Sequence, residues 1–209
     1  MGTARSFCAE LRSAIVSNIA SFSRRDIGLA DRRAAAVAVA VLPDDQGNAC
    51  FILTRRTSKV GSHKGQWALP GGRFEDGEDA HAAALREMHE EVGVEPGAVE
   101  VLGSLDDYAT RSGYVITPVV IWCGLDTTLV ADPYEVAEVY RVPVADLEKS
   151  DVPHVREIPE SDQPVISIPL LGANIHAPTA AVLYQFSEVG LGGRDTRVSH
   201  FEQPVFAWR

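Results

Sequence analysis

Three closely spaced glutamates are the residues whose types and spacing most clearly indicate chemistry in this sequence. Glu87, Glu90 and Glu91 stand at positions i, i+3 and i+4. On a helix this spacing brings all three carboxylates to one face, where their charges repel one another. A solvated acidic face is the ordinary alternative. Between Asp79 and Gly93, however, Arg86 is the only lysine or arginine that could offset the negative charge. Clustered hard oxygen ligands without cations of their own are what Mg²⁺ or Mn²⁺ binds.

A helix over residues 79–92 must position these carboxylates. Asp79 stands at its start, where the helix dipole favours an acid, and Gly93 stands where a left-handed terminating residue belongs. A short strand, stopped at Pro70-Gly71-Gly72, precedes the helix.

The stretch from Gly72 to Val94 resembles the Nudix box. That pattern is Gly, five residues, Glu, seven residues, Arg-Glu, an apolar residue, any residue, Glu-Glu, any residue, Gly and an apolar residue. All of its fixed positions are present: Gly72, Glu78, Arg86, Glu87, Met88, Glu90, Glu91, Gly93 and Val94. The resemblance implies a loop–helix–loop that holds a divalent metal against a diphosphate.

The resemblance also implies roles for these residues. Glu87, Glu90 and Glu91 would be ligands of one or more Mg²⁺ or Mn²⁺ ions, with the carbonyl of Gly72 as a further ligand. Arg86 would pair with Glu78 and orient the carboxylates, as residues behind a metal site do. The metal would neutralise the diphosphate and activate water for in-line attack at phosphorus.

The general base stays open at this point. Glu90 or Glu91 could serve from the helix, and Glu135 could serve from the loop segment DPYEVAEV. For Glu135, a surface acid in a turn is an equally good interpretation.

A basic segment precedes the box and predicts where the substrate binds. Its cationic residues, with one histidine among them and no acid, are Arg55, Arg56, Lys59, His63 and Lys64. In a chain of net charge −10 this local positive patch suits an extra phosphate on the substrate. A solvated basic loop is the alternative.

The same segment resembles the extension found in coenzyme A diphosphatases of the Nudix superfamily. The residues that match are Leu53, Thr54, Arg56, Thr57, Gly65, Pro70, Gly71 and Gly72. Gly61 stands where that subfamily has Arg, Leu69 where it has Phe, and His176 where it tends to have Trp. The resemblance spans roughly residues 34–185.

This second resemblance implies hydrolysis of coenzyme A or acyl-CoA to adenosine 3′,5′-bisphosphate and 4′-phosphopantetheine or its acylated form. The departures leave open another nucleoside diphosphate, such as ADP-ribose. A binding or regulatory module that kept the fold and lost turnover is the third hypothesis, against which the three crowded glutamates argue.

The remaining sequence predicts an α+β fold, with a mixed β-sheet sandwiched between helices (α/β/α). Apolar periodicity predicts helices over 6–22 and 179–189, and strands over 34–42, 50–54, 99–106, 114–123 and the start of 138–147. Residues 150–163, rich in Pro, Asp and Glu, are predicted to be irregular, and the last six residues to form a terminal strand or tail.

Length and composition bound the remaining expectations. The 209 residues predict one domain over 31–190, with a helical extension at 1–30 and a tail at 191–209 packing on it. The acidic balance argues against nucleic acid as a partner, and no apolar run approaches the ~20 residues of a membrane helix. Three scattered cysteines without a CxxC pair predict reduced thiols and a cytoplasmic location. The expected partner is a small nucleotide diphosphate; a homodimer is compatible with the sequence, which does not give the oligomeric state.

Overall fold

A mixed β-sheet forms the centre of the molecule. The computed structural model describes residues 4–57 and 65–208. In this part of the chain the sheet has eight strands, and its main path runs β3-β2-β1-β7-β5. In addition β4 pairs with β1, β6 with β7, and β8 with β2. The strands are β1 (Arg33–Pro43), β2 (Ala49–Arg56), β3 (Trp67–Ala68), β4 (Gly71–Arg73), β5 (Val99–Ser104), β6 (Tyr108–Ala109), β7 (Tyr114–Cys123) and β8 (Val136–Pro143).

Strand β1 is the organising strand of this sheet. It pairs in parallel with β7 and antiparallel with β2 and β4, so the sheet is mixed as predicted. The turn between β1 and β2 closes through the carboxylate of Asp44, which accepts from the backbone N–H groups of Gln46 and Asn48 at 2.9 and 2.8 Å. The strands predicted over 34–42 and 50–54 are thus confirmed, and they pair as a hairpin.

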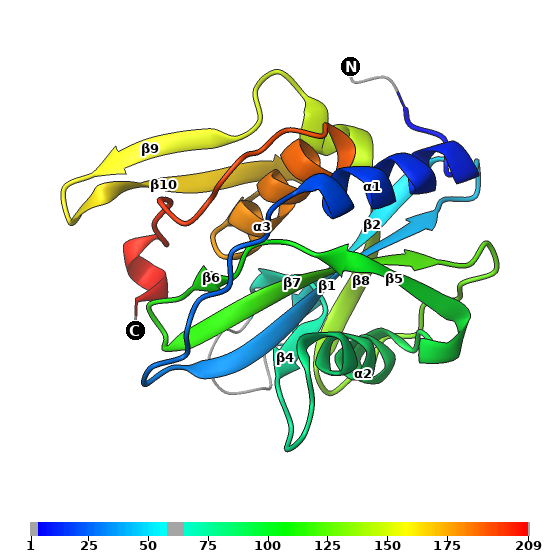
Figure 1. Cartoon of the computed structure of the whole chain (residues 1–209), viewed down its shortest axis with the longest axis horizontal. Helices are drawn as coiled ribbons and strands as arrows, with labels where there is room; N and C mark the ends of the chain where they lie inside the picture. The colour runs from blue at the N-terminus through cyan, green and yellow to red at the C-terminus, as the bar shows by residue number, and fades with distance from the viewer. Residues whose placement is uncertain (1–3, 58–64, 209) are drawn as a thin grey trace.

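The two faces of β1 are covered by different helices. Alternate residues of a strand point to opposite faces. Ala36, Ala38 and Ala40 pack with α2 (Ala80–Val92), whereas Val39 and Val41 join a cluster with residues of α1 (Ala9–Ser21) and α3 (Thr179–Gln185). Figure 1 shows α2 on one side of the sheet and α1 and α3 on the other. The predicted α/β/α arrangement is confirmed.

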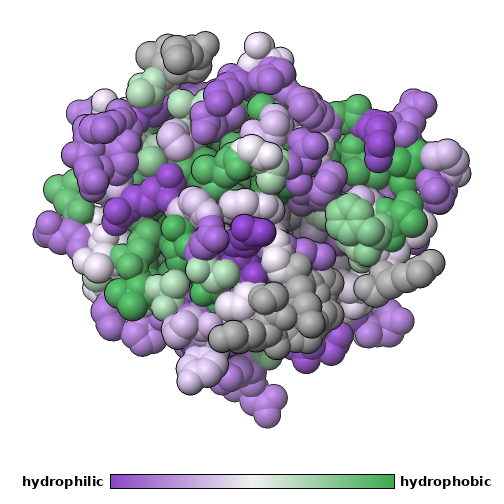
Figure 2. Space-filling view, turned by 180° about the vertical axis from the view of Figure 1, so that it is seen from behind, coloured by the Kyte–Doolittle hydropathy of each residue, from purple (hydrophilic) through white to green (hydrophobic). Residues whose placement is uncertain are grey.

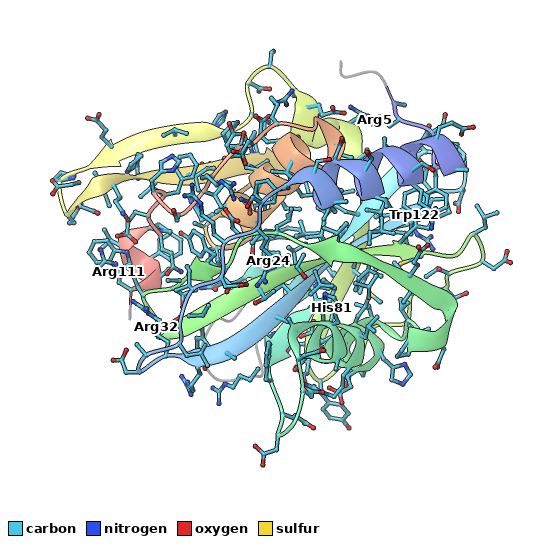
Figure 3. All side chains as sticks on the ribbon, viewed as in Figure 1. Arg5, Arg24, Arg32, His81, Arg111 and Trp122 are labelled. Atoms are coloured by element: carbon cyan, nitrogen blue, oxygen red, sulfur yellow. The ribbon has the colours of Figure 1, made fainter. Side chains whose placement is uncertain are left out.

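Helix α1 is built into the core and does not extend away from it. Its buried residues Leu11, Ile15 and Ile19 recur at helical spacing and belong to the same cluster as the valines of β1. Just before α1, Phe7 stacks on Trp122 of β7 with ring centroids 4.0 Å apart (Trp122 is labelled in Figure 3). The N-terminal extension predicted over residues 1–30 thus contributes packing surface, while its boundary stays a prediction.

A second, three-stranded sheet lies beside α3 and corrects one expectation. Its strands are β9 (His154–Ile158), β10 (Ser161–Leu170) and β11 (Ala173–His176), in the order β11-β10-β9. The irregular structure predicted for 150–163 is therefore wrong. Most of β9 is exposed, so its sequence has no buried face to reveal; its hydrogen-bond partner β10 carries the buried side chains Val165, Ile166 and Ile168. A strand that pairs with a more buried neighbour, and has no buried face itself, shows no alternation of apolar residues in its sequence.

The rest of the chain after α3 wraps back onto the fold. Helix α3 continues as η3 (Phe186–Leu191), and a short η4 (Val205–Ala207) stands where a terminal strand or tail was predicted. The other short turns of helix are η1 (Pro96–Ala98) and η2 (Val144–Glu148). Within the described residues, no helix is long and apolar enough to cross a membrane. Figure 2 shows hydrophobic residues in separate patches among hydrophilic ones on the face that it views.

Candidate functional site

Helix α2 presents the predicted carboxylates because both of its ends are fixed. Asp79 accepts a hydrogen bond from the backbone N–H of Ala82 at 2.9 Å, and Gly93 ends the helix in the left-handed region at φ 72°. Ala84 and Met88 are fully buried against the sheet. Packing of this apolar face fixes the rotation of the helix about its axis.

Strand β4 approaches the helix closely at Gly72. A Cβ atom at this position would lie 2.1 Å from Oε1 of Glu87, so any side chain would displace that carboxylate. The backbone N–H of the preceding residue, Gly71, donates to Oε2 of Glu91 at 3.4 Å. The predicted proximity of Gly72 to the glutamates is therefore present, and it depends on the absence of a side chain.

Arg86 holds three of the glutamates together. Its guanidinium donates to both carboxylate oxygens of Glu78, at 2.8 and 3.0 Å, and to Glu87 and Glu90, both at 2.9 Å. A further bond at 2.9 Å reaches the carbonyl of Arg73 on β4. The hydrogen bonds from Arg86 lower the pKa of Glu78 below its ordinary value. The supporting pair predicted between Glu78 and Arg86 is thus formed as a fork on one carboxylate.

Glu91 is the most buried carboxylate of the cluster, only 2% exposed. Burial raises its pKa to about 7; the charge of Arg56 opposes this shift, and the charges of Glu87 and Glu135 add to it. Arg56 contacts Glu91 at 3.1 Å and Glu135 at 3.6 Å. Burial also raises the pKa of Glu87. For both glutamates, the nearby positive charge therefore does not compensate for the solvent lost on burial.

A cavity of about 520 Å³ lies over this cluster. Five glutamates and three arginines are among its lining residues, so it carries an excess of two negative charges: Glu75, Glu87, Glu90, Glu91, Glu135, Arg56, Arg73 and Arg86. Within the described residues, no group of three acidic, histidine or cysteine side chains already converges as a set of metal ligands. Arginines bond the oxygens instead. The carboxylate oxygens, the raised pKa values of Glu87 and Glu91, and the negative excess nevertheless fit a divalent cation.

A second cavity, of about 650 Å³, adjoins the first. The two share Arg56 and the β4 residues Gly71, Gly72 and Arg73 as lining residues. A molecule with a diphosphate at the glutamates can therefore extend into the larger space without leaving the protein surface.

Comparison with known proteins identifies the family. The sequence model of the NUDIX domain matches residues 32–161. This chain belongs to the Nudix family. Members of that family use divalent metal cations and bind small nucleotide substrates, and the matched residues include the stretch from Gly72 to Val94.

Curated relatives and solved structures agree with this assignment. The uncharacterized Nudix hydrolases NudL of Enterobacter sp. (strain 638) and Escherichia coli (strain K12 / DH10B) are each 40% identical to this chain, over 118 and 116 residues. The matches cover 56% and 55% of this chain, and 60% and 59% of the relatives' own length.

Two solved structures share the fold at low identity. A Caenorhabditis elegans Ap4A hydrolase binary complex has a TM-score of 0.50 at 17% identity, covering 74% of this chain and 95% of that one. A MutT/nudix family protein from Enterococcus faecalis has a TM-score of 0.50 at 19% identity, covering 76% and 62%. At these identities the likeness concerns the Nudix fold alone.

The predicted substrate-binding residues divide into three groups. Arg56 lines both cavities. Arg55, its neighbour on β2, lines neither cavity; its guanidinium lies 3.8 Å from Glu138 and 5.9 Å from the ring centroid of Trp67. The remaining three, Lys59, His63 and Lys64, lie outside the described residues, as does Gly61.

The larger cavity brings in residues that the sequence did not assign to the Nudix site. Tyr114 comes from β7, Asn174 and His176 from β11, and Phe206 from η4. Trp67 of β3 packs against Tyr140 at 5.2 Å between ring centroids and also lines this cavity. No local pattern marks these residues, because they converge from segments far apart in the chain.

Proposed function

We propose that this Nudix protein is a Mg²⁺- or Mn²⁺-dependent diphosphatase that hydrolyses coenzyme A or acyl-CoA. The products are adenosine 3′,5′-bisphosphate and 4′-phosphopantetheine or its acylated form. The observation that carries the proposal is the glutamate cluster beneath Gly72, which lies in a net negative cavity opening into a larger one that no described acidic residue lines.

The chain's own residues can hold the ion and its substrate. Glu87, Glu90, Glu91 and the carbonyl of Gly72 would bind the cation, exchanging contacts that Arg86 and Arg56 make now. When bound, the cation would offset the diphosphate charge and lower the pKa of the attacking water. Arg86 keeps its bonds to Glu78 and to the carbonyl of Arg73, and the second of these holds the helix against β4.

Glu135 is our proposed general base. It lines the glutamate cavity from the loop before β8, and this loop is bonded to the helix by the N–H of Asp132, which donates to the carbonyl of Glu91 at 3.0 Å. Its backbone carbonyl accepts from the N–H of Thr57 at 2.9 Å, which ties this loop to the end of β2. The side chain is 45% exposed and so can reach a water molecule.

The choice of coenzyme A is supported by sequence and by charge. Arg56 stands at the border of both cavities, where it can contact a phosphate of the substrate. The segment around it matches the extension of coenzyme A diphosphatases at eight positions. A cytoplasmic location is part of the same proposal.

A substrate panel with Mg²⁺ or Mn²⁺, with products separated by chromatography, tests the proposal. We expect release of 4′-phosphopantetheine from coenzyme A, at a higher kcat/KM than any turnover of ADP-ribose. A preference for ADP-ribose would refute the substrate, and no turnover of any diphosphate would favour a binding module.

A further inference from the structure

The larger cavity has walls from three parts of the chain. One wall is the sheet, with Trp67 of β3 and Tyr114 of β7; the second is β11 and the turn after it, with Asn174 and His176; the third is the C-terminal segment with Phe206. The cavity begins at β4, directly beside the glutamate cluster. Its position makes it the place for one of the two groups that a diphosphate links.

Among the described residues, the charges at this cavity lie at the end formed by the sheet. There Arg33 and Arg55 lie over the rings of Tyr114 and Trp67, 4.4 and 5.9 Å from the ring centroids. Among the described residues that line it, only Arg56 and Arg73 carry a full charge, and both also line the glutamate cavity. Burial lowers the pKa of His176, with the charge of Arg156 acting in the same direction, and both favour the neutral imidazole. A phosphate deep in the cavity would lose water without gaining a counter-charge from these residues.

The uncharged end offers aromatic and amide surfaces instead. Phe206 is 65% exposed at the rim, although large apolar side chains are normally covered. The ring of His176 meets it edge-on at 5.4 Å between centroids. Nδ1 of His176 is buried without a hydrogen-bond partner among the described residues. Because this nitrogen has no partner among the described residues, a turn of the ring toward the cavity would let it bond an amide group of a ligand there.

The wall formed by the C-terminal segment is anchored before any ligand arrives. Tyr108 donates to the carbonyl of Phe201 at 2.9 Å, and the backbone N–H of Arg111 donates to the side chain of Gln203 at 2.7 Å. The Arg111 guanidinium also bonds Glu202 and lies 4.8 Å above the ring of Trp208 (Arg111 is labelled in Figure 3). A preformed wall loses little entropy when a ligand binds.

We propose that this cavity, bounded by Trp67, Tyr114, His176 and Phe206, binds the uncharged pantetheine arm of the substrate. The phosphorylated adenosine half then lies outside it, on the other side of the glutamate cluster. This inference rests on the proposed function, since it assumes that coenzyme A is the molecule cleaved. Coenzyme A suits a cavity charged at one end only, because its pantetheine arm is neutral and its adenosine carries the third phosphate.

Each of the two reaction products contains one half of the substrate, so their inhibition constants report on the two halves of the site separately. We would measure inhibition constants of 4′-phosphopantetheine and adenosine 3′,5′-bisphosphate for the wild type, Phe206→Ala and His176→Phe. Phe206→Ala should weaken 4′-phosphopantetheine about tenfold, since an aromatic contact and its buried area are lost. His176→Phe keeps the ring contact and removes its hydrogen bonds, so a several-fold loss is expected. Val205→Ala is the matched control, because Val205 adjoins Phe206, is exposed and lines neither cavity.

The outcomes distinguish this inference from the proposed function. Weaker 4′-phosphopantetheine with unchanged adenosine 3′,5′-bisphosphate supports it. The reverse pattern, or no change for either product, overturns it even if coenzyme A is cleaved. If the wild type fails to cleave coenzyme A yet binds 4′-phosphopantetheine through Phe206, the function falls and the pantetheine site stands. If it does neither, both fall.

Discussion

At the scale of single residues, the site is a balance between carboxylates and two arginines. Arg86 forms ion pairs with Glu78, Glu87 and Glu90, while Arg56 forms ion pairs with Glu91 and Glu135. Each arginine thus shares its charge among more than one acid. A divalent ion would supply the missing positive charge. Because the arginines share their charge unevenly, the individual glutamates are not equivalent in this site.

Glu91 should be the least replaceable of the three box glutamates, because burial leaves its carboxylate no water to substitute for a metal contact. We expect Glu91→Gln to lower kcat on the order of a thousandfold, with the fold retained in circular dichroism. Glu95→Gln is the control, because that carboxylate is 72% exposed and lines neither cavity. Near-normal turnover of Glu91→Gln would remove Glu91 from the metal site.

Glu135 should affect the chemical step more than metal binding. If it is the base, Glu135→Gln lowers kcat about a hundredfold and leaves the Mn²⁺ dissociation constant within a few-fold of the wild type. Titration with Mn²⁺ and steady-state kinetics would measure the two effects. Glu138→Gln, three residues further on and outside both cavities, is the control. A large loss of Mn²⁺ affinity would instead make Glu135 a ligand.

At the scale of elements, the close approach of β4 to α2 is the contact that shapes the site. Gly72→Ala should lower kcat/KM about ten- to a hundredfold, because the added Cβ displaces the Glu87 carboxylate. The measurement is turnover at saturating metal, together with the melting temperature. Gly97→Ala is matched, since a Cβ there meets no atom within 4 Å. Equal activity of the two variants would show that Glu87 tolerates displacement.

The sequence predicted the elements that are specified by residues close together in the chain. Spacing and capping residues placed α2 at 79–92, and the structure has it at Ala80–Val92. The same reasoning missed β9, which is held by hydrogen bonds to β10 and has no buried face of its own. It also missed Asn174, His176 and Phe206 as cavity residues. Their meeting depends on contacts across the fold, such as Tyr108 with Phe201, which no spacing within a segment encodes.

At the scale of the whole molecule, buried thiols make the fold sensitive to alkali. Burial raises the pKa of Cys50 to about 11 and of Cys123 to about 12, and no disulfide is formed among the described residues. In the unfolded chain a thiol ionises near its ordinary pKa of about 8.5. Because the folded pKa values are raised, the stability that they represent is complete below pH ~8.5 and is lost as pH rises toward the folded values.

Denaturant unfolding between pH 8 and 11 should therefore show a falling free energy of unfolding, by up to about 1.4 kcal/mol per pH unit for each thiol. Cys123→Ala should reduce this slope, whereas Cys8→Ser, at a half-buried position, should not. A pH-independent free energy over this range would show that both thiols ionise as readily in the folded protein as in the unfolded chain.

The C-terminal segment links the stability of the whole chain to the shape of the larger cavity. Glu202 is 4% exposed, and its carboxylate bonds the side chain of Arg111 and the backbone N–H of Gln203. Arg111→Ala leaves this buried carboxylate without its cation and removes the support of Trp208. We expect a lower melting temperature and a KM for coenzyme A raised about fivefold, with kcat little changed, because the cavity wall moves and the glutamates do not.

Arg194→Ala separates this effect from a general loss of ion pairs. Arg194 pairs with Glu188 at an exposed position and lines neither cavity. It should therefore leave KM unchanged even if the melting temperature falls slightly. If Arg111→Ala lowers the melting temperature as expected while KM stays at the wild-type value, the segment stabilises the fold without shaping the substrate cavity. A rise in KM for coenzyme A that 4′-phosphopantetheine inhibition mirrors would instead tie the anchoring of this segment to recognition of the neutral arm.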